Sequence, residues 1–254
     1  MLAHPSIVIL TGAGISAESG LGTFRDEDGL WARHRIEDVA TPEAFARNPQ
    51  LVVDFYNARR AQAHKAVPNA GHQALARLQA DHPGGVLLVT QNVDDLHEKA
   101  GSRDVVHMHG KLSSALCGAC DHRWAAALRM QVGDTCPDCG APAARPDIVW
   151  FGEMPCHMDR IEEALARADI FAAIGTSGNV YPAAGFVQMA RYVGARTVEM
   201  NLDPSETVAL FAETRPGRAS ATVPAWVDEV LAGRGRIQRA LNSVKSQRPG
   251  GLGN

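Results

Sequence analysis

The sequence predicts an α/β protein with a parallel central sheet, and two observations carry this prediction. Short unbroken apolar runs recur at residues 7–10, 86–90 and 170–174. Such runs are typical of strands that are buried on both faces of a parallel sheet. Segments with helical periodicity separate them, as in the crossover units that join parallel strands.

The remaining segments extend this pattern. Further strands are expected at 105–108 and 196–200, and helices at 70–80, 157–168, near Pro182 and at 225–241. Residues 144–147 are expected to return the chain to the same sheet. Residues 36–67 predict helices without strands, because Pro42 and Pro49 stand where a first helical turn tolerates proline.

Length and charge limit the classes of function. The chain has 254 residues, enough for one large domain or for one domain with an inserted module. Its net charge of −3 includes no block of like charge that would indicate direct nucleic-acid binding. The N-terminus lacks the pattern of a signal peptide, and no apolar run is as long as a membrane span. We therefore expect a cytoplasmic protein with no membrane partner.

The loop after the first strand is suited to phosphate. Residues 12–16 read GAGIS, and a stretch able to start a helix follows. Glycine allows a sharp turn, and a helix N-terminus offers N–H groups and a partial positive charge. The loop matches only the first half of the usual dinucleotide fingerprint, because Ala17 stands where a third glycine is expected. This motif alone leaves an ordinary strand–turn–helix open.

Polar residues also follow other predicted strands. Gln91, Asn92 and Asp94 follow one strand, His109 follows the next, and the sequence GTS at 175–177 follows a third. Parallel sheets place their ligand sites at this edge. A lone histidine is more often structural than catalytic, and His107 alternates with His109 along the same segment.

Four of the five cysteines predict a zinc site. Cys117 and Cys120 form one CxxC pair, Cys136 and Cys139 form a second, and fifteen residues separate the pairs. This spacing is typical of a four-cysteine zinc module. Because the protein fills all four ligand positions, the metal is expected to be structural. Cys156 is assigned no role.

Taken in order, these motifs resemble the sirtuin family, the NAD-dependent protein lysine deacylases. The motifs are GAGIS at 12–16, GLGTFR at 20–25, TQNVD at 90–94, HG at 109–110, the two CxxC pairs, PDIVWFGE at 146–153, GTS at 175–177 and NL at 201–202. The resemblance covers residues 7–241. It implies a Rossmann-like domain of residues 1–35, 68–111 and 145–245, and a small domain made of a helical insertion (36–67) and a zinc module (112–144). Residues 246–254 are expected to be a disordered tail.

The resemblance also implies the cofactors and the chemistry. NAD would be a co-substrate, and one Zn²⁺ would be structural. The residues implied in NAD binding are Gly12, Ala13, Gly14, Ser16, Phe24, Arg25, Gln91, Asn92, Asp94, Gly175, Thr176, Ser177, Asn201, Leu202 and Ala219. Phe24 and Arg25 would belong to a mobile covering loop. His109 would be the general base that promotes attack by a ribose hydroxyl, so that nicotinamide is released and the acyl group ends on ADP-ribose.

Acyl-lysine proteins or peptides would be the partners, bound as an extended strand between Gly152-Glu153 and residues 178–181. The residues implied in substrate binding are Tyr56, Arg59, Val149, Phe151, Gly152, Glu153, Asn179 and Tyr181. Trp150 stands where many members of the family carry phenylalanine.

Tyr56 and Arg59 are the residues that indicate which acyl group the protein accepts. They are three residues apart and so share one face of a helix. Their context resembles the sirtuin subclass that accepts succinyl- and malonyl-lysine, in which such a pair holds the acyl carboxylate. The alternative is an amphipathic helix with a packed tyrosine and solvated arginines.

The function implied is NAD-dependent removal of succinyl, malonyl and acetyl groups from lysine. Two other functions remain open. One is an NAD hydrolase or ADP-ribosyltransferase, and the other is a non-catalytic module that binds NAD and zinc.

Overall fold

The structure, a computed structural model, describes residues 4–22 and 34–246, and side chains up to residue 233. Phe24, Arg25 and residues 247–254 of the predicted tail lie outside the described residues. No helix in the described part of the chain is long and apolar enough to cross a membrane.

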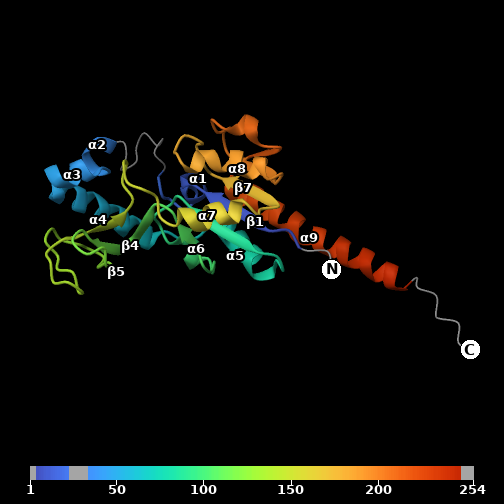
Figure 1. Cartoon of the computed structure of the whole chain (residues 1–254), viewed down its shortest axis with the longest axis horizontal. Helices are drawn as coiled ribbons and strands as arrows, with labels where there is room; N and C mark the ends of the chain where they lie inside the picture. The colour runs from blue at the N-terminus through green and yellow to red at the C-terminus, as the bar shows by residue number, and fades with distance from the viewer. Residues whose placement is uncertain (1–3, 23–33, 247–254) are drawn as a thin grey trace, which may run out of the picture.

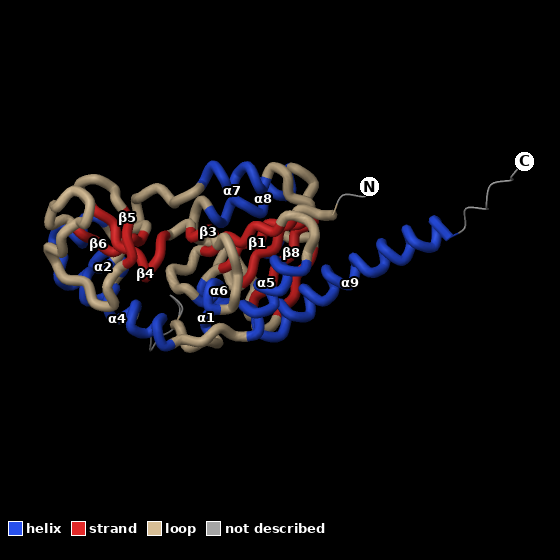
Figure 2. Tube along the Cα trace, turned by 90° about the horizontal axis from the view of Figure 1, so that it is seen from below, coloured by secondary structure: helices blue, strands red, loops and turns tan. Residues whose placement is uncertain are grey.

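A six-stranded parallel sheet forms the centre of the larger half of the molecule. Its strands are β1 (Ile7–Thr11), β2 (Val86–Thr90), β3 (Val106–His107), β7 (Ile170–Ile174), β8 (Arg196–Asn201) and β9 (Glu213–Pro216). Their spatial order is β3-β2-β1-β7-β8-β9. Figure 2 labels β3, β1 and β8 of this sheet. The chain therefore winds outward from β1 in one direction and from β7 in the other, which confirms the predicted Rossmann-like fold.

Helices cover both faces of this sheet, and β1 is accordingly buried at every position and apolar from Ile7 to Leu10. Ile7 and Ile9 belong to a core shared with α5 (Ala70–Asp81) and α9 (Ala219–Ser246). Val8 and Leu10 belong to a second core, shared with α7 (Met158–Leu165) and α8 (Phe186–Tyr192). The short helices α1 (Ala13–Ala17), α6 (Leu96–Lys99), η2 (Ala183–Gly185) and η3 (Val208–Leu210) lie in the connections.

The smaller half lies at one end of the molecule (Figure 1). It contains α2 (Ile36–Val39), α3 (Pro42–Arg47) and α4 (Pro49–Lys65), and an antiparallel sheet of order β5-β4-β6. The strands of that sheet are β4 (Gly110–Cys117), β5 (Arg123–Ala125) and β6 (Ala144–Ile148). Helices α3 and α4 begin as predicted, since Thr41 and Asn48 cap them and a proline follows each cap.

Buried polar contacts join the helical insertion to the zinc module. Arg60 of α4 donates from Nε to the Leu112 carbonyl at 2.6 Å and from Nη1 to Asn57 Oδ1 at 2.8 Å. Asn57 in turn exchanges two hydrogen bonds with the Met130 backbone, at 2.8 and 2.9 Å. These contacts support the proposal that residues 36–67 and 112–144 form one small domain.

Three features differ from the sequence prediction. Residues 144–147 do not return to the parallel sheet, because β6 pairs antiparallel with β4. Strands β4, β5 and β9 were not predicted, since none of them carries an unbroken apolar run and β5 and β9 are only three or four residues long. Helix α9 starts at Ala219 rather than at residue 225, because Pro224 lies inside the helix instead of at its boundary.

Candidate active site

The loops after β1 and β7 meet where the winding direction of the sheet reverses. Gly14 N donates to the Gly175 carbonyl at 2.9 Å. A Cβ on Gly14 would lie 2.7 Å from Gly175 Cα, and Gly175 itself has a φ of +65°. Both positions therefore require glycine. In doubly wound sheets this crevice is where nucleotides bind, so the arrangement fits the expected diphosphate position.

A buried polar cluster links the end of β1 to the end of β2. Asn92 Nδ2 donates to the Gly12 carbonyl at 3.0 Å and to Ser16 Oγ at 3.1 Å, and Ser16 Oγ donates to Asp94 Oδ2 at 3.1 Å. Burial raises the pKa of Asp94. Protein groups already engage the Ser16 hydroxyl, so we interpret this side chain as a support for Asn92 and Asp94.

His109 lies next to this cluster, where the chain passes from the large sheet to the small one. Its Nδ1 is 3.2 Å from the Gln91 carbonyl, which only accepts hydrogen bonds. Nδ1 therefore carries the hydrogen, and in the neutral ring Nε2 keeps its lone pair. Burial lowers the pKa of His109 below its ordinary value of 6.5. The imidazole is thus neutral at pH 7 and able to accept a proton.

The backbone conformation at position 110 explains why a glycine follows His109. Its φ is +82°, and a Cβ would lie 2.1 Å from the Asp147 carbonyl oxygen. Strand β4 starts here, directly against β6. Only two residues, Met108 and His109, connect β3 of the large sheet to β4 of the small one.

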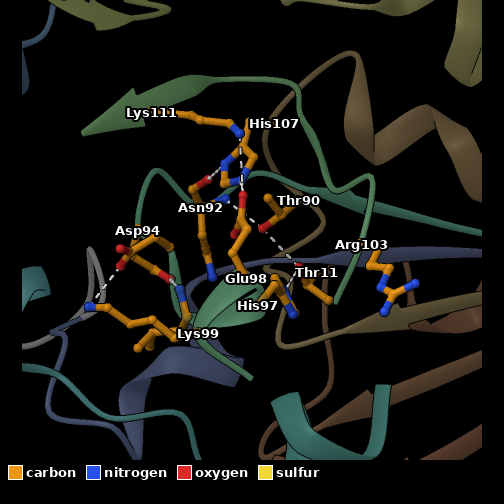
Figure 3. A network of polar contacts seen from close by, with 12 residues as sticks. Thr11, Thr90, Asn92, Asp94, His97, Glu98, Lys99, Arg103, His107 and Lys111 are labelled. Atoms are coloured by element: carbon orange, nitrogen blue, oxygen red, sulfur yellow. Dashed lines mark hydrogen bonds and ion pairs between the residues drawn. The ribbon is translucent and has the colours of Figure 1, made fainter. Parts of the chain in front are cut away.

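His107 has different surroundings, which Figure 3 shows. Its side chain is 3% exposed, with Nδ1 3.1 Å from the Asn92 carbonyl and Nε2 2.8 Å from Glu98 Oε1. Glu98 Oε1 also lies 3.3 Å from Lys111 Nζ of β4. His107 therefore connects α6 to the backbone that carries Asn92, which is a supporting position rather than one that faces a substrate.

The Glu98 contact predicts a pH-dependent loss of stability. Burial is the largest single influence and would raise the pKa of Glu98. The hydrogen bond from His107, the electrostatic attraction of His107 and Lys111 and a backbone hydrogen bond together outweigh burial and bring the pKa to about 2. A carboxyl with a depressed pKa stabilises the fold above its unfolded value, near 4.5, and loses this effect as the pH falls toward 2. Because the side chain is 35% exposed, we expect Glu98→Gln to cost about 1 kcal/mol at pH 7.

Urea unfolding between pH 3 and pH 7 checks this prediction. The difference between wild type and Glu98→Gln should shrink as the pH falls below 4.5. Glu163→Gln is the matched control, because Glu163 pairs with Arg167 on the surface with 66% of its side chain exposed. A loss of the same size and pH dependence in both variants would contradict the role given to Glu98.

The remaining residues expected to bind NAD lie along the same sheet edge. Asn201, 8% exposed, donates from Nδ2 to the Thr176 carbonyl at 2.8 Å. Ser177 Oγ accepts from Asn179 N at 3.3 Å, so Asn179 belongs to the β7 loop. Leu202, at the end of β8, is 67% exposed. Ala219 starts α9 beside Gly71 of α5, and Glu18 after α1 accepts a hydrogen bond from the next residue, Ser220.

The loop after β6 begins against His109, because Val149 N donates to the His109 carbonyl at 3.0 Å. Glu153 closes this loop by accepting from Trp150 N at 2.8 Å. Its carboxylate also holds Arg145 in a bidentate pair, at 2.7 and 2.9 Å. The Glu153 side chain is therefore structural, whereas Phe151 and Gly152 are exposed. Tyr181, in the facing segment of the predicted groove, is 72% exposed.

Tyr56 and Arg59 lie on one face of α4, as predicted. Arg59 Cζ is 5.9 Å from the Tyr56 ring centroid. The Tyr56 side chain is buried, and its hydroxyl accepts a hydrogen bond from Trp150 Nε1 at 3.2 Å. Burial lowers the pKa of Arg59, while Tyr56 and Asp94 favour its charged form. Arg59 thus lies beside Tyr56, whose hydroxyl contacts Trp150 in the loop at residues 149–153 that is expected to bind acyl-lysine (the acyl-lysine loop).

The structure shows two supporting residues beside the candidate site that the sequence did not indicate. Arg145 pairs with Glu153 of the acyl-lysine loop, and His107 contacts the Asn92 carbonyl. Each acts through a tertiary contact, so neither stands out in a single sequence. The only available signal was position, since both lie next to predicted site residues.

The four cysteines form the predicted metal site. Their Sγ atoms all lie within 4.8 Å of one another, with 3.7 Å between Cys117 and Cys139 and 3.8 Å between Cys120 and Cys136. A tetrahedral zinc ion with Zn–S bonds of about 2.3 Å requires S–S separations of about 3.8 Å, so the cluster fits zinc. The backbone N–H of Ala119 donates to Cys117 Sγ at 3.4 Å and lowers the pKa of this thiol, which favours the thiolate.

Together these features define a class of protein: a nucleotide-binding α/β domain with a small domain that a structural zinc ion stabilises. The sequence model of the Sir2 family matches residues 12–182. The chain is 54% identical over 230 residues to a Caulobacter vibrioides protein named NAD-dependent protein deacylase, covering 89% of this chain and 97% of that protein. It is 57% identical over 229 residues to a protein of the same name from Bdellovibrio bacteriovorus, with the same coverage.

Structural comparison agrees. A solved Sir2 homologue in complex with NAD superposes with a TM-score of 0.82 at 39% identity, covering 89% of this chain and 90% of that one. The chain belongs to the Sir2 family.

Proposed function

We propose that this protein is an NAD-dependent protein lysine deacylase that removes succinyl, malonyl and acetyl groups and releases nicotinamide and O-acyl-ADP-ribose. The observation that carries the proposal is the position of His109. Its ring is held by the Gln91 carbonyl at the nucleotide edge, and its own carbonyl holds the first residue of the loop expected to bind acyl-lysine. One residue therefore contacts both halves of the proposed reaction site.

The neutral imidazole suits the role of general base. Nε2 keeps its lone pair while Nδ1 donates to Gln91, so the ring can take a proton from a ribose hydroxyl at neutral pH. The low pKa that burial imposes keeps this form available. Asn92 and Asp94 are held rigidly beside it by Ser16, which supports their assignment to the nicotinamide side.

The substrate is proposed to bind as an extended strand through backbone groups. Gly152 on one side and residues 178–181 on the other are exposed or partly exposed and follow well-anchored residues. Pairing through the backbone accepts many sequences, which suits a protein deacylase. We propose that these substrates are cytoplasmic proteins.

Tyr56 and Arg59 are proposed to bind the distal carboxylate of succinyl and malonyl groups. An arginine fork matches a carboxylate, and a charge-assisted contact in a partly buried position is worth about 1.5–3 kcal/mol. The contact of Arg59 with the Tyr56 ring and its electrostatic interaction with Asp94 support a position of this contact beside the proposed reaction site.

Comparing the two acyl groups on one peptide tests the proposal. The same sequence carrying acetyl- or succinyl-lysine is incubated with NAD, and nicotinamide and acyl-ADP-ribose are followed. Peptide-dependent formation of both products supports deacylation. Nicotinamide release without the peptide supports NAD hydrolysis, and no release under either condition supports a non-catalytic module.

Arg59→Met should lower kcat/KM for succinyl-lysine by about 10- to 100-fold relative to acetyl-lysine, since it removes the charged partner of the acyl carboxylate. Arg59→Lys is the matched variant, because it keeps a charge without the planar fork and should recover only part of the loss. Equal losses on the two substrates would show that Arg59 serves the fold rather than the acyl group.

A further inference from the structure

Trp150 lies at the junction between the acyl-lysine loop and α4. Its side chain is 2% exposed and belongs to a core that also contains Tyr56. The Arg145 guanidinium lies 3.6 Å from the indole ring centroid, and Phe45 packs against the ring at 5.3 Å. Since Arg145 is itself fixed by Glu153, the indole has one defined orientation.

The indole N–H determines how the Tyr56 hydroxyl can be used. An indole nitrogen only donates, so in the 3.2 Å contact the phenol oxygen must be the acceptor. Within the described part of the chain, the contact with Trp150 is the one hydrogen bond of the Tyr56 hydroxyl. Burial raises the pKa of Tyr56, so the hydroxyl keeps its proton. The phenol proton must therefore point away from Trp150, toward another acceptor.

Arg59 lies beside the same ring, on the next turn of α4. A carboxylate only accepts hydrogen bonds. Placed near Arg59, it would accept the hydrogen bond that the Tyr56 hydroxyl can still donate. We propose that Trp150 is a positioning residue for acyl specificity: its N–H orients the Tyr56 hydroxyl as a donor to a carboxylate held by Arg59. This inference rests on the proposed function and adds a third residue to the proposed acyl site.

Phenylalanine is the informative replacement, since it keeps an aromatic ring in the core but has no N–H. Trp150→Phe is expected to lower the ratio of succinyl to acetyl kcat/KM by about 3- to 10-fold, mainly through the KM of the succinyl peptide. Tyr56→Phe should lower the same ratio at least as far. Because both changes remove one shared hydrogen-bonding arrangement, the double variant should match Tyr56→Phe alone.

A second replacement separates this role from packing. Incorporation of β-(3-benzothienyl)alanine at position 150 keeps the size of the indole and replaces N–H by sulfur, and it should reproduce the lowered ratio. An unchanged ratio in this variant, or additive effects in the double variant, would overturn the inference. If Tyr56→Phe and Arg59→Met also leave the ratio unchanged, the proposed acyl site itself fails. If only the position-150 variants do so, the role of Trp150 alone fails.

Discussion

Replacing His109 with alanine is expected to lower kcat/KM for acyl transfer by about 10²- to 10⁴-fold, the usual contribution of a general base. The fold should be unaffected, because the side chain is partly exposed and makes its hydrogen bond to a backbone carbonyl at a loop. Nicotinamide and acyl-ADP-ribose formation measure the activity, and circular dichroism measures the fold. His64→Ala is the control, since His64 is exposed on α4 and outside the site.

The pH profile gives the same assignment a second test. A base acts in its neutral form, so kcat/KM should fall as the pH drops through the His109 pKa. Burial holds that pKa below 6.5, so activity should be constant around pH 7 and decline below 6.5. More than a tenth of wild-type turnover in His109→Ala, or an acidic limb above pH 7 in the wild type, would refute the assignment.

Replacing Cys136 with serine is expected to remove the zinc ion and unfold much of the small domain. Cys136 is buried, and its Sγ is one of four that converge on the metal position. Zinc binding to such modules contributes on the order of 10 kcal/mol to folding, far more than a core of this size supplies. Among the described residues, the buried cluster around the module is small and consists of Val53, Ala115, Met130 and Ala144.

Elemental analysis and thermal unfolding measure both consequences. The wild type should hold one zinc ion per chain, and Cys136→Ser should hold none and melt at a lower temperature. Cys156→Ser is the matched control, because Cys156 lies outside the cluster and should keep both the metal and the melting temperature. One zinc ion per chain in Cys136→Ser, or unchanged melting without zinc, would show that the module folds without the metal.

Much of the fold could be predicted because its central strands are unusual in composition. A strand such as β1 is covered on both faces, so its first four residues are all apolar and the run is visible without any partner. Each cysteine pair lies within four consecutive residues, so the zinc site could also be predicted from the sequence. Strand β9 could not be predicted, because an edge strand needs little apolar surface and reads Glu-Thr-Arg-Pro. The pairing of β6 with β4 depends on long-range contacts that local composition does not encode.

The candidate site divides in the same way. The positions of Gln91, Asn92 and His109 could be predicted from where the strands end, since parallel strands present their carboxyl ends at one edge of the sheet. What could not be predicted is which groups those side chains contact. Ser16 is expected to hold the diphosphate, and nothing in the sequence indicated that its hydroxyl also contacts Asn92 and Asp94. The partners of Glu153 and Trp150 were hidden for the same reason, because they come from other parts of the chain.

The two-residue connection between β3 and β4 has a mechanical consequence. The chain passes from the large sheet to the small one through Met108 and His109, so this crossing is one pivot for any rotation of one sheet against the other. Atoms at a pivot move least during such a rotation. An imidazole at this crossing would therefore keep its place during such a rotation, and the proposed base would need no realignment afterwards.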